Sequence, residues 1–365
     1  MNIMEYLKSF SSHTDYEEYV TGGTMARPNV SYCEDVKDVH YNPIPHDYSQ
    51  DYLTTVALGG GTISFNIPKA IDTEYITSIS YSTDDGNTWT TTNNTDGRTE
   101  SIIVTVNVNR GDSILWKGEA SSLADVTDSS TFSSTTDFNI EGNIMSLAYG
   151  DDFKDKTELT EAGIFIGLFN GSRVVEAENL SLPATKLSTY CYTSMFASCA
   201  SLVSAPKLIA TELGIMCYAI MFSGCTSLTT APELPATALE AGCYMMMFAD
   251  CTSLTSAPEL PATTLTQQCY SYMFQGCTSL ENAPQLSATT LAQSCYEYMF
   301  SGCTNLNYIK AMFTTTPSTT YTQNWVNGVA TNGTFVKNSA ATWNPEEVRG
   351  VNGVPTNWTV QTASE

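Results

Sequence analysis

The sequence is poor in histidine and in positive charge. Its 365 residues include three histidines and 15 lysines and arginines, against 38 aspartates and glutamates, which gives a net charge of −23. This acidic balance argues against nucleic acid or an anionic membrane as a direct partner. The histidines are His13, His40 and His46, so the rest of the chain lacks the commonest general base.

Several motifs and segments are also missing. The chain has no G-x-S-x-G, P-loop, dinucleotide-binding or H-E-x-x-H motif. No stretch approaches the roughly 18 apolar residues of a membrane-spanning helix. The N-terminus shows no positively charged start followed by an apolar run, so we expect no signal peptide and synthesis in the cytoplasm. We therefore expect no enzymatic activity, no cofactor, no metal and no membrane insertion.

The dominant feature is the pattern C-Y-x-x-M-F-x-x-C, repeated five times at a constant step of 26 residues. The copies begin at Cys191, Cys217, Cys243, Cys269 and Cys295. A fixed step of this length is typical of a solenoid, whose repeats bury their apolar faces against each other. Because Cys243, Met247 and Cys251 are spaced by four, they predict one side of a short helical turn. The stretch 254–260 is then expected to be extended, which makes each repeat a helical turn, a corner, a short strand and a corner.

Equivalent positions of the repeats form columns of identical residues, which we expect to be the core. Each Phe should stack on the Phe of the next coil, because strand-paired coils lie about 4.8 Å apart. Ten of the eleven cysteines also lie in two columns, and only Cys33 stands outside. Buried, reduced thiols are the first interpretation, and disulfides or a metal are the alternative. The apolar columns are Phe196, Phe222, Phe248, Phe274 and Phe300; Met195, Met221, Met247, Met273 and Met299; and Leu202, Leu228, Leu254, Leu280 and Leu306.

The repeat resembles the BspA-type leucine-rich repeats of bacterial surface proteins. The match covers about residues 180 to 312. Each turn is longer than in the common version by a Leu-Pro-Ala-Thr segment, which begins at Leu234, at Leu260 and, with Ser287 in place of proline, at Leu286. The resemblance implies a leucine-rich-repeat solenoid but names no ligand. A degenerate copy without cysteines at 168–187 is expected to cap it, as terminal repeats do.

Residues 1–50 differ from the rest of the chain. Their prolines at 28, 43 and 45 favour an extended path, and a segment too short for its own core orders on a partner. The segment resembles the N-terminal stretch of predicted virion proteins of tailed phages, including crAss-like phages of gut Bacteroidales. That resemblance implies an arm that attaches to capsid or tail proteins. The predicted anchoring residues are Arg27, Pro28, Asn29, Tyr32, His40, Tyr41 and Pro43. For the histidines, ordinary polar packing is expected, and a metal site with Cys33 is the alternative.

Residues 51–140 alternate in the manner of strands and predict a small antiparallel β-sandwich. The segment 82–89 matches the Asp-box pattern S-x-D-x-G-x-T-W, which also occurs in sialidase propellers. A propeller needs several blades, but this chain has one copy. We therefore interpret it as a hairpin device, in which Asp84 caps the turn, Gly86 supplies a positive φ and Trp89 packs beneath.

The predicted fold class is mainly β with short helices: a leucine-rich-repeat solenoid preceded by a small antiparallel β-sandwich and an extended N-terminal arm. After the arm (1–50) and the sandwich (51–140) we expect a linker at 141–161 and the solenoid at 162–312. Residues 313–365 predict a small β cap, because the Asn-Gly pairs at 327, 332 and 352 suit tight hairpins.

Two rows of the solenoid are candidate binding residues. Ile220, Met246, Tyr272 and Tyr298 occupy one varying position between fixed columns, which suits recognition, or else fills a convex face or subunit contact. Glu233 and Glu259 are equivalent carboxylates of adjacent coils, and paired carboxylates serve glycosidases. Because Lys207 and Gln285 continue that row, a solvated surface is the better interpretation.

The leading hypothesis for function is a virion appendage, either a head fibre, a tail fibre or a capsid decoration protein. It would be made in the host cytoplasm, exposed on the particle and bound to a host-surface glycan or protein, with a homotrimer as one possible assembly. The alternatives are a BspA-like adhesin of the bacterial cell surface, exported by an unrecognised route, and a glycan-processing enzyme that uses the acidic row.

Overall fold

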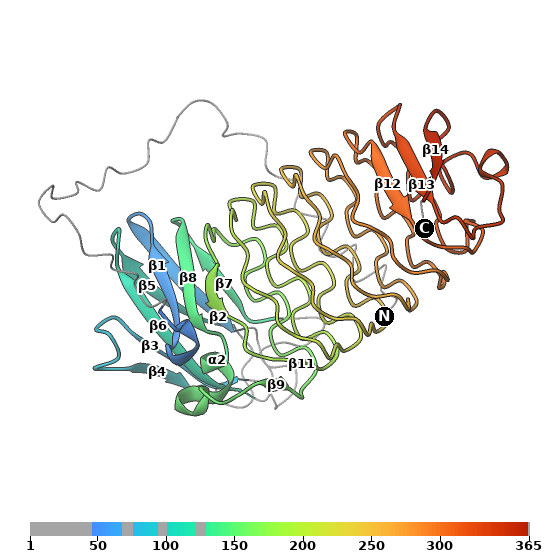
Figure 1. Cartoon of the computed structure of the whole chain (residues 1–365). Helices are drawn as coiled ribbons and strands as arrows, with labels where there is room; N and C mark the ends of the chain where they lie inside the picture. The colour runs from blue at the N-terminus through green and yellow to red at the C-terminus, as the bar shows by residue number, and fades with distance from the viewer. Residues whose placement is uncertain (1–45, 68–75, 94–100, 121–128, 364–365) are drawn as a thin grey trace, which may run out of the picture. The chain divides into compact units, whose positions relative to one another are not determined.

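The computed structural model describes residues 46–67, 76–93, 101–120 and 129–363, so nearly all of the predicted arm lies outside it. The described chain is mainly β, with 4% helix and a β-solenoid of about eight turns (Figure 1). Residues 47–365 form one compact unit. The prediction of a mainly β chain built on a repeat solenoid is confirmed.

The chain ahead of the solenoid forms two sheets. After a single 3-10 turn, η1 (Tyr48–Gln50), the strands are β1 (Leu53–Ala57), β2 (Gly61–Ile67), β3 (Ile76–Ser82), β4 (Thr90–Asn93), β5 (Ile102–Val108), β6 (Ser113–Ala120), β7 (Thr131–Ser134) and β8 (Phe138–Asn143). The small sheet has the strand order β5-β2-β7. The large sheet has the order β10-β8-β1-β6-β3-β4, in which the edge strand β10 (Asn179–Ser181) comes from later in the chain. The sheets contact each other through aromatic rings, since Trp116 of β6 lies 6.2 Å from Phe65 and 5.3 Å from Phe132.

The Asp-box hairpin between β3 and β4 has the geometry that its sequence predicts. Asp84 accepts hydrogen bonds from the Ser82 hydroxyl (2.7 Å) and from the Thr88 N–H (2.8 Å) and hydroxyl (2.6 Å). These bonds lower the pKa of the Asp84 carboxyl, the Thr88 bonds most. Gly86 has a φ of 83°, and the Trp89 ring packs on Tyr52 at 5.0 Å. All the side-chain oxygens of Asp84 are therefore occupied in closing the turn.

The segment predicted as a linker, 141–161, is packed into the fold. It contains α2 (Ser146–Tyr149), the 3-10 turn η2 (Gly150–Asp152) and β9 (Glu158–Leu159). Leu147 and Phe153 are fully buried. The Ser146 hydroxyl accepts a bond from the Leu53 N–H (3.0 Å) and donates to the carbonyl of Trp116 (2.9 Å). The core then continues into the solenoid, where Phe132 stacks on Phe169 at 5.1 Å.

Each coil contains a run of turns in which the backbone repeats every four residues. In the second full copy, Met216, Ile220 and Gly224 all have positive φ, of 53°, 62° and 75°. Two kinds of backbone hydrogen bond alternate along the run. The N–H of Ala219 donates to the carbonyl oxygen of Met216, three residues back in the same coil (3.1 Å). The N–H of the next residue, Ile220, donates to the carbonyl oxygen of Met245 in the following coil (2.8 Å). The predicted helical turn is therefore wrong, because an α-helix would direct every N–H four residues back within the segment.

The predicted short strand of each repeat is reduced to single bridges. No strand is formed between β11 (Lys186–Leu187), which pairs with β9, and β12 (Tyr308–Ala311). One such bridge joins Thr230 to Ser256 in parallel. A proline follows two residues later in each coil, as at Pro232 and Pro258, and proline cannot donate to a ladder.

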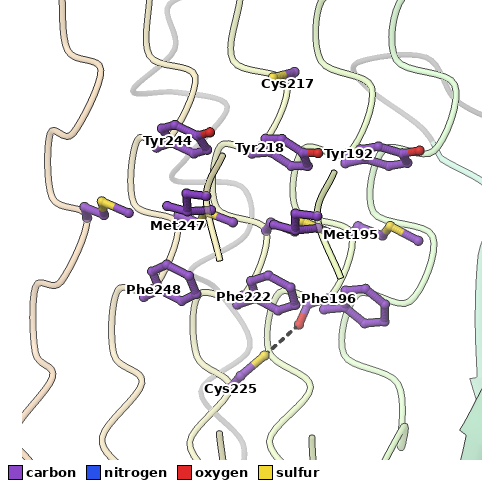
Figure 2. Packing of buried hydrophobic residues seen from close by; sticks show 14 of the residues in the cluster. Tyr192, Met195, Phe196, Cys217, Tyr218, Phe222, Cys225, Tyr244, Met247 and Phe248 are labelled. Atoms are coloured by element: carbon purple, nitrogen blue, oxygen red, sulfur yellow. Dashed lines mark hydrogen bonds between the residues drawn. The ribbon is translucent and has the colours of Figure 1, made fainter. Parts of the chain in front are cut away.

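The predicted core columns are confirmed. Every Phe, Met and Leu of the three columns in the five full copies is fully buried. Consecutive Phe rings stack with centroids 5.2 to 5.8 Å apart and within 10° of parallel (Figure 2). The tyrosine after the first cysteine of each copy forms a further stack, with centroids 5.7 to 6.1 Å apart. The degenerate copy joins these stacks, since Phe169 lies 5.2 Å from Phe196.

At the C-terminus the coils continue beyond the predicted boundary at 312. The strands β12, β13 (Thr334–Lys337) and β14 (Thr359–Thr362) pair in parallel, so the predicted hairpins are wrong. Asn324 and Gly328 repeat the positive φ values of earlier coils, 50° and 75°. Trp325 is fully buried, and a 3-10 turn, η3 (Pro345–Glu347), lies between β13 and β14.

We expect Phe248→Ala to lower the free energy of unfolding by about 3–5 kcal/mol. Phe248 lies 5.7 Å from both Phe222 and Phe274, and a rigid stack closes only partly around the void. Urea denaturation followed by circular dichroism measures the loss, with Phe248→Leu as the milder control. A loss below about 1 kcal/mol would contradict a rigid column.

Candidate functional site

The two cysteine columns are built into the core. All ten cysteines of the repeats are free and buried, which confirms the interpretation as reduced thiols; Cys33 lies outside the described residues. The second cysteine of each copy donates its S–H to the carbonyl oxygen of the Phe in the preceding coil, as from Cys225 to Phe196 at 3.1 Å (Figure 2). The same bond is made by Cys199 (2.9 Å), Cys251 (3.1 Å), Cys277 (3.0 Å) and Cys303 (2.9 Å).

Burial keeps these thiols protonated. Desolvation raises the pKa of Cys199 and of Cys251 to about 12, and nearby hydrogen bonds offset this only in part. The thiolate is the form that attacks electrophiles and binds metals. At neutral pH the columns therefore supply packing and hydrogen bonds between coils.

The first row of predicted binding residues has an unusual backbone. Ile220, Met246, Tyr272 and Tyr298 have φ values of 62°, 55°, 58° and 52°. Ser194 (56°) and Asn324 (50°) extend the same row by one coil at each end, and we call these six residues the left-handed row. A positive φ is uncommon outside glycine, and for a β-branched residue such as isoleucine it is an outlier.

The left-handed row shares its backbone conformation with the rows on either side. Four residues further along, Gly224, Gly276 and Gly302 adopt φ values of 75°, 72° and 80°, while Ser198 and Asp250 have a φ of 59° in the other two full copies. Four residues earlier, glycine occurs in one full copy, at Gly242 (60°), and the other copies have Tyr190 (60°), Met216 (53°), Gln268 (56°) and Ser294 (51°). Glycine adopts this conformation without strain, whereas other residues pay roughly 1–3 kcal/mol each. The left-handed row therefore carries a backbone cost that it shares with the row four residues earlier.

The aromatic end of the left-handed row is an ordered ladder. The rings of Tyr272 and Tyr298 are 4.6 Å apart and nearly parallel, at 9°. Asn324 donates from Nδ2 to the hydroxyl oxygen of Tyr298 at 2.7 Å. Burial, together with the charge of Glu297 and the neighbouring Tyr298, raises the pKa of Tyr272 to about 12. Both tyrosines are partly exposed, so this end of the row presents aromatic surface.

The second predicted row lies elsewhere on the solenoid. Glu233 and Glu259 are exposed, as expected for a solvated row. Glu233 follows Ile220 by 13 positions, which is half of the 26-residue coil, so the two rows lie on different parts of each coil. The structure therefore does not bring the carboxylates to the left-handed row.

A charged cluster that sequence reasoning missed lies beside the Asp-box hairpin. The Lys117 ammonium bonds both carboxylate oxygens of Asp151, at 2.7 and 3.0 Å, and lies 4.2 Å from the centre of the Trp89 ring. Tyr52 donates its hydroxyl to the same Asp151 (2.5 Å), and burial with this bond raises the pKa of Tyr52 to about 12. Because the cation is already paired and covered, the cluster joins η2 to the large sheet.

Other site classes find no support in the described ranges. Within them, no group of three or more His, Cys, Asp and Glu residues is arranged to hold a metal ion, and no helix has the length and hydrophobicity to cross a bilayer. The predicted anchoring residues, Arg27 to Pro43, lie outside those ranges. The glycines at positions 224, 276, 302 and 328 signal a positive φ four residues after the left-handed row, but the sequence of the row itself carries no such signal.

No protein-family description matches the chain, and no similar protein was found among curated proteins or solved structures. Function must therefore be inferred from the residues themselves.

The buried thiols predict a loss of stability at alkaline pH. A folded-state pKa near 12 exceeds the unfolded value of about 8.5, so the stabilisation is complete below about pH 8.5 and is lost as the pH rises toward 12. Urea midpoints between pH 7 and 11 measure this fall. A thiol reagent at pH 8 should label none of the ten repeat cysteines until urea is added. Rapid labelling of the folded protein, in a Cys33→Ser background, would contradict the burial.

Proposed function

We propose that the protein is a structural appendage of a phage particle, either a head fibre, a tail fibre or a decoration protein, which displays its solenoid to bind a glycan or protein of the host surface. In this proposal residues 1–50 attach the chain to capsid or tail proteins. The two sheets are the β-sandwich that spaces the arm from the repeats, and the repeats are of the BspA type. The N-terminal resemblance supports the attachment, and the left-handed row supports the adhesion.

The observation that carries the adhesive role is the aromatic end of the left-handed row, where the partly exposed rings of Tyr272 and Tyr298 stack at 4.6 Å on a backbone of positive φ. Strain of this kind persists where the side chain contributes something that glycine cannot. Met246, Tyr272 and Tyr298 are partly exposed and offer apolar and amphipathic contact area, whereas Ile220 is buried. Tyrosine also loses little conformational entropy on binding. The regular spacing of the coils fixes these side chains before a ligand arrives, which lowers the cost of association.

A role without catalysis follows from how the reactive side chains are used. The cysteines are buried, the second cysteine of each copy is bonded to a core carbonyl, and the repeats contain no histidine. Glu233 and Glu259 are exposed and lie in a row with Lys207 and Gln285. Such carboxylates are solvated and lack the buried partner that tunes a general acid.

Glycine substitution tests the left-handed row directly. We expect the variant Met246→Gly, Tyr272→Gly, Tyr298→Gly, which leaves the buried Ile220 in place, to lose at least about tenfold in affinity for host cells, as removal of a central contact does. Relief of backbone strain offsets part of the lost packing, so the fold should survive. The control is Glu233→Ala, Glu259→Ala, which should bind normally. Unchanged binding by a folded glycine variant would exclude the row as the adhesive site.

Deletion of residues 1–46 tests the attachment. This leaves the compact unit 47–365 intact, so we expect a folded protein that still binds host cells but is missing from purified particles. Antibody labelling of particles, imaged by electron microscopy, measures incorporation. Arg27→Ala, Tyr32→Ala in the full chain should reduce it in the same direction. Normal incorporation of the deleted chain would contradict the anchoring role, and the protein on uninfected cells would favour the bacterial adhesin.

A further inference from the structure

The strand β5 forms the outer edge of the small sheet. Among the described residues it pairs with β2 alone, through seven consecutive antiparallel pairs from Ile67–Ile102 to Gly61–Val108. In an antiparallel pair, every second residue directs its N–H and C=O to the partner, and the residues between direct theirs away. One side of β5 therefore carries a row of backbone donors and acceptors without a partner strand in the described part of the chain.

The other ends of the two sheets are protected. β7 at the opposite edge of the small sheet is bonded to the first coil, through the N–H of Phe132 and the carbonyl of Leu168 (2.8 Å). β4 at the edge of the large sheet has four residues. Short strands and covered edges are the usual means by which proteins prevent pairing between molecules.

Within the described residues, none of these protections is present on β5. It is seven residues long, its sequence IIVTVNV contains no charge and no proline, and its register with β2 has no bulge. Val104 and Val106 face the core, while Thr105, Asn107 and Ile103 are exposed. Ile103 is 63% exposed, the highest value among the large hydrophobic residues of the described chain that are exposed. A long, straight, uncharged edge of this kind is suited to pairing with another strand.

The occupant that fits this edge best is a second copy of the same strand. Under a twofold axis, each outward N–H of one antiparallel strand meets an outward C=O of its copy, so the edge is complementary to itself. Charge favours the same choice. The chain has a net charge of −23, and two copies repel each other over most of their surface, but β5 offers a contact without charge.

We propose that the protein forms a twofold dimer in which β5 pairs antiparallel with β5 of a second copy, so that the two small sheets join into one. An axis at Thr105, the middle residue of the strand, places Ile103 of each copy beside Asn107 of the other. The pairing covers both exposed isoleucines and extends the valine face of the core. It depends on β5 alone and holds whether or not the left-handed row binds a host.

The experiment is sedimentation equilibrium of the full chain, compared with Ile103→Lys. At about 10 µM we expect the unchanged protein to have twice the mass of one chain. We expect at least tenfold weaker association for Ile103→Lys, because a lysine on an edge strand opposes pairing. The matched control is Thr90→Lys, which adds the same charge to the exposed surface of β4 and should remain dimeric. A monomer, a trimer, or a folded Ile103→Lys protein that remains dimeric would overturn the proposal.

A cross-link keeps the test independent of the folding of the lysine variant. In a Cys33→Ser background, Thr105→Cys places two thiols on the axis, where opposed Cα atoms lie about 4.5–5.5 Å apart and permit a disulfide. Mild oxidation should give a covalent dimer for Thr105→Cys and none for Thr90→Cys. Equal yields from the two variants, or none from Thr105→Cys, would contradict pairing through β5.

Discussion

Hydrogen bonds between coils are the interaction on which the solenoid depends. In the run of turns of each coil, every second backbone N–H donates to a carbonyl oxygen of the following coil. Examples are the N–H of Tyr218 with the carbonyl of Cys243 (3.0 Å) and the N–H of Phe222 with the carbonyl of Met247 (2.9 Å). These bonds fix the coils in register, so identical side chains fall one above the other. Insertion of one residue in a run would move every later side chain out of its column. The constant 26-residue step of the full copies is the consequence.

The same bonding pattern determines which residues the backbone accepts. To direct alternate N–H groups along the solenoid, the chain turns back at every fourth residue through a positive φ. Each coil therefore has three positions that favour glycine. Where the sequence supplies glycine, as at Gly224, the position has a backbone role. Where it supplies Ile220 or Tyr298 instead, strain is accepted, and the reason lies in the side chain.

The sequence predicted the period, the columns and the thiols, because burial repeats identically in each coil. It could not predict the turn run, because a spacing of four between Cys243, Met247 and Cys251 matches one side of an α-helix as well as a four-residue backbone repeat. The prediction of C-terminal hairpins was wrong for a related reason. Asn-Gly permits a positive φ in a tight hairpin and equally in a coil, and Gly328 uses its φ of 75° to continue the solenoid.

The left-handed row shows where sequence reasoning and structure complement each other. The residue type changes along this row, whereas it is constant in the core columns. A change of residue type is equally expected at surface positions that have no function. The positive φ of the backbone does not separate this row from the one four residues earlier, which has Tyr190, Met216, Gln268 and Ser294 in the same conformation. What distinguishes the row is the stack of Tyr272 on Tyr298, whose rings are 4.6 Å apart and partly exposed. Packing between neighbours explains why they are ordered, and the half-buried Met246 continues the strip up to the buried Ile220. This order is what the proposed adhesive role requires, because side chains that are fixed before a partner arrives lower the cost of association.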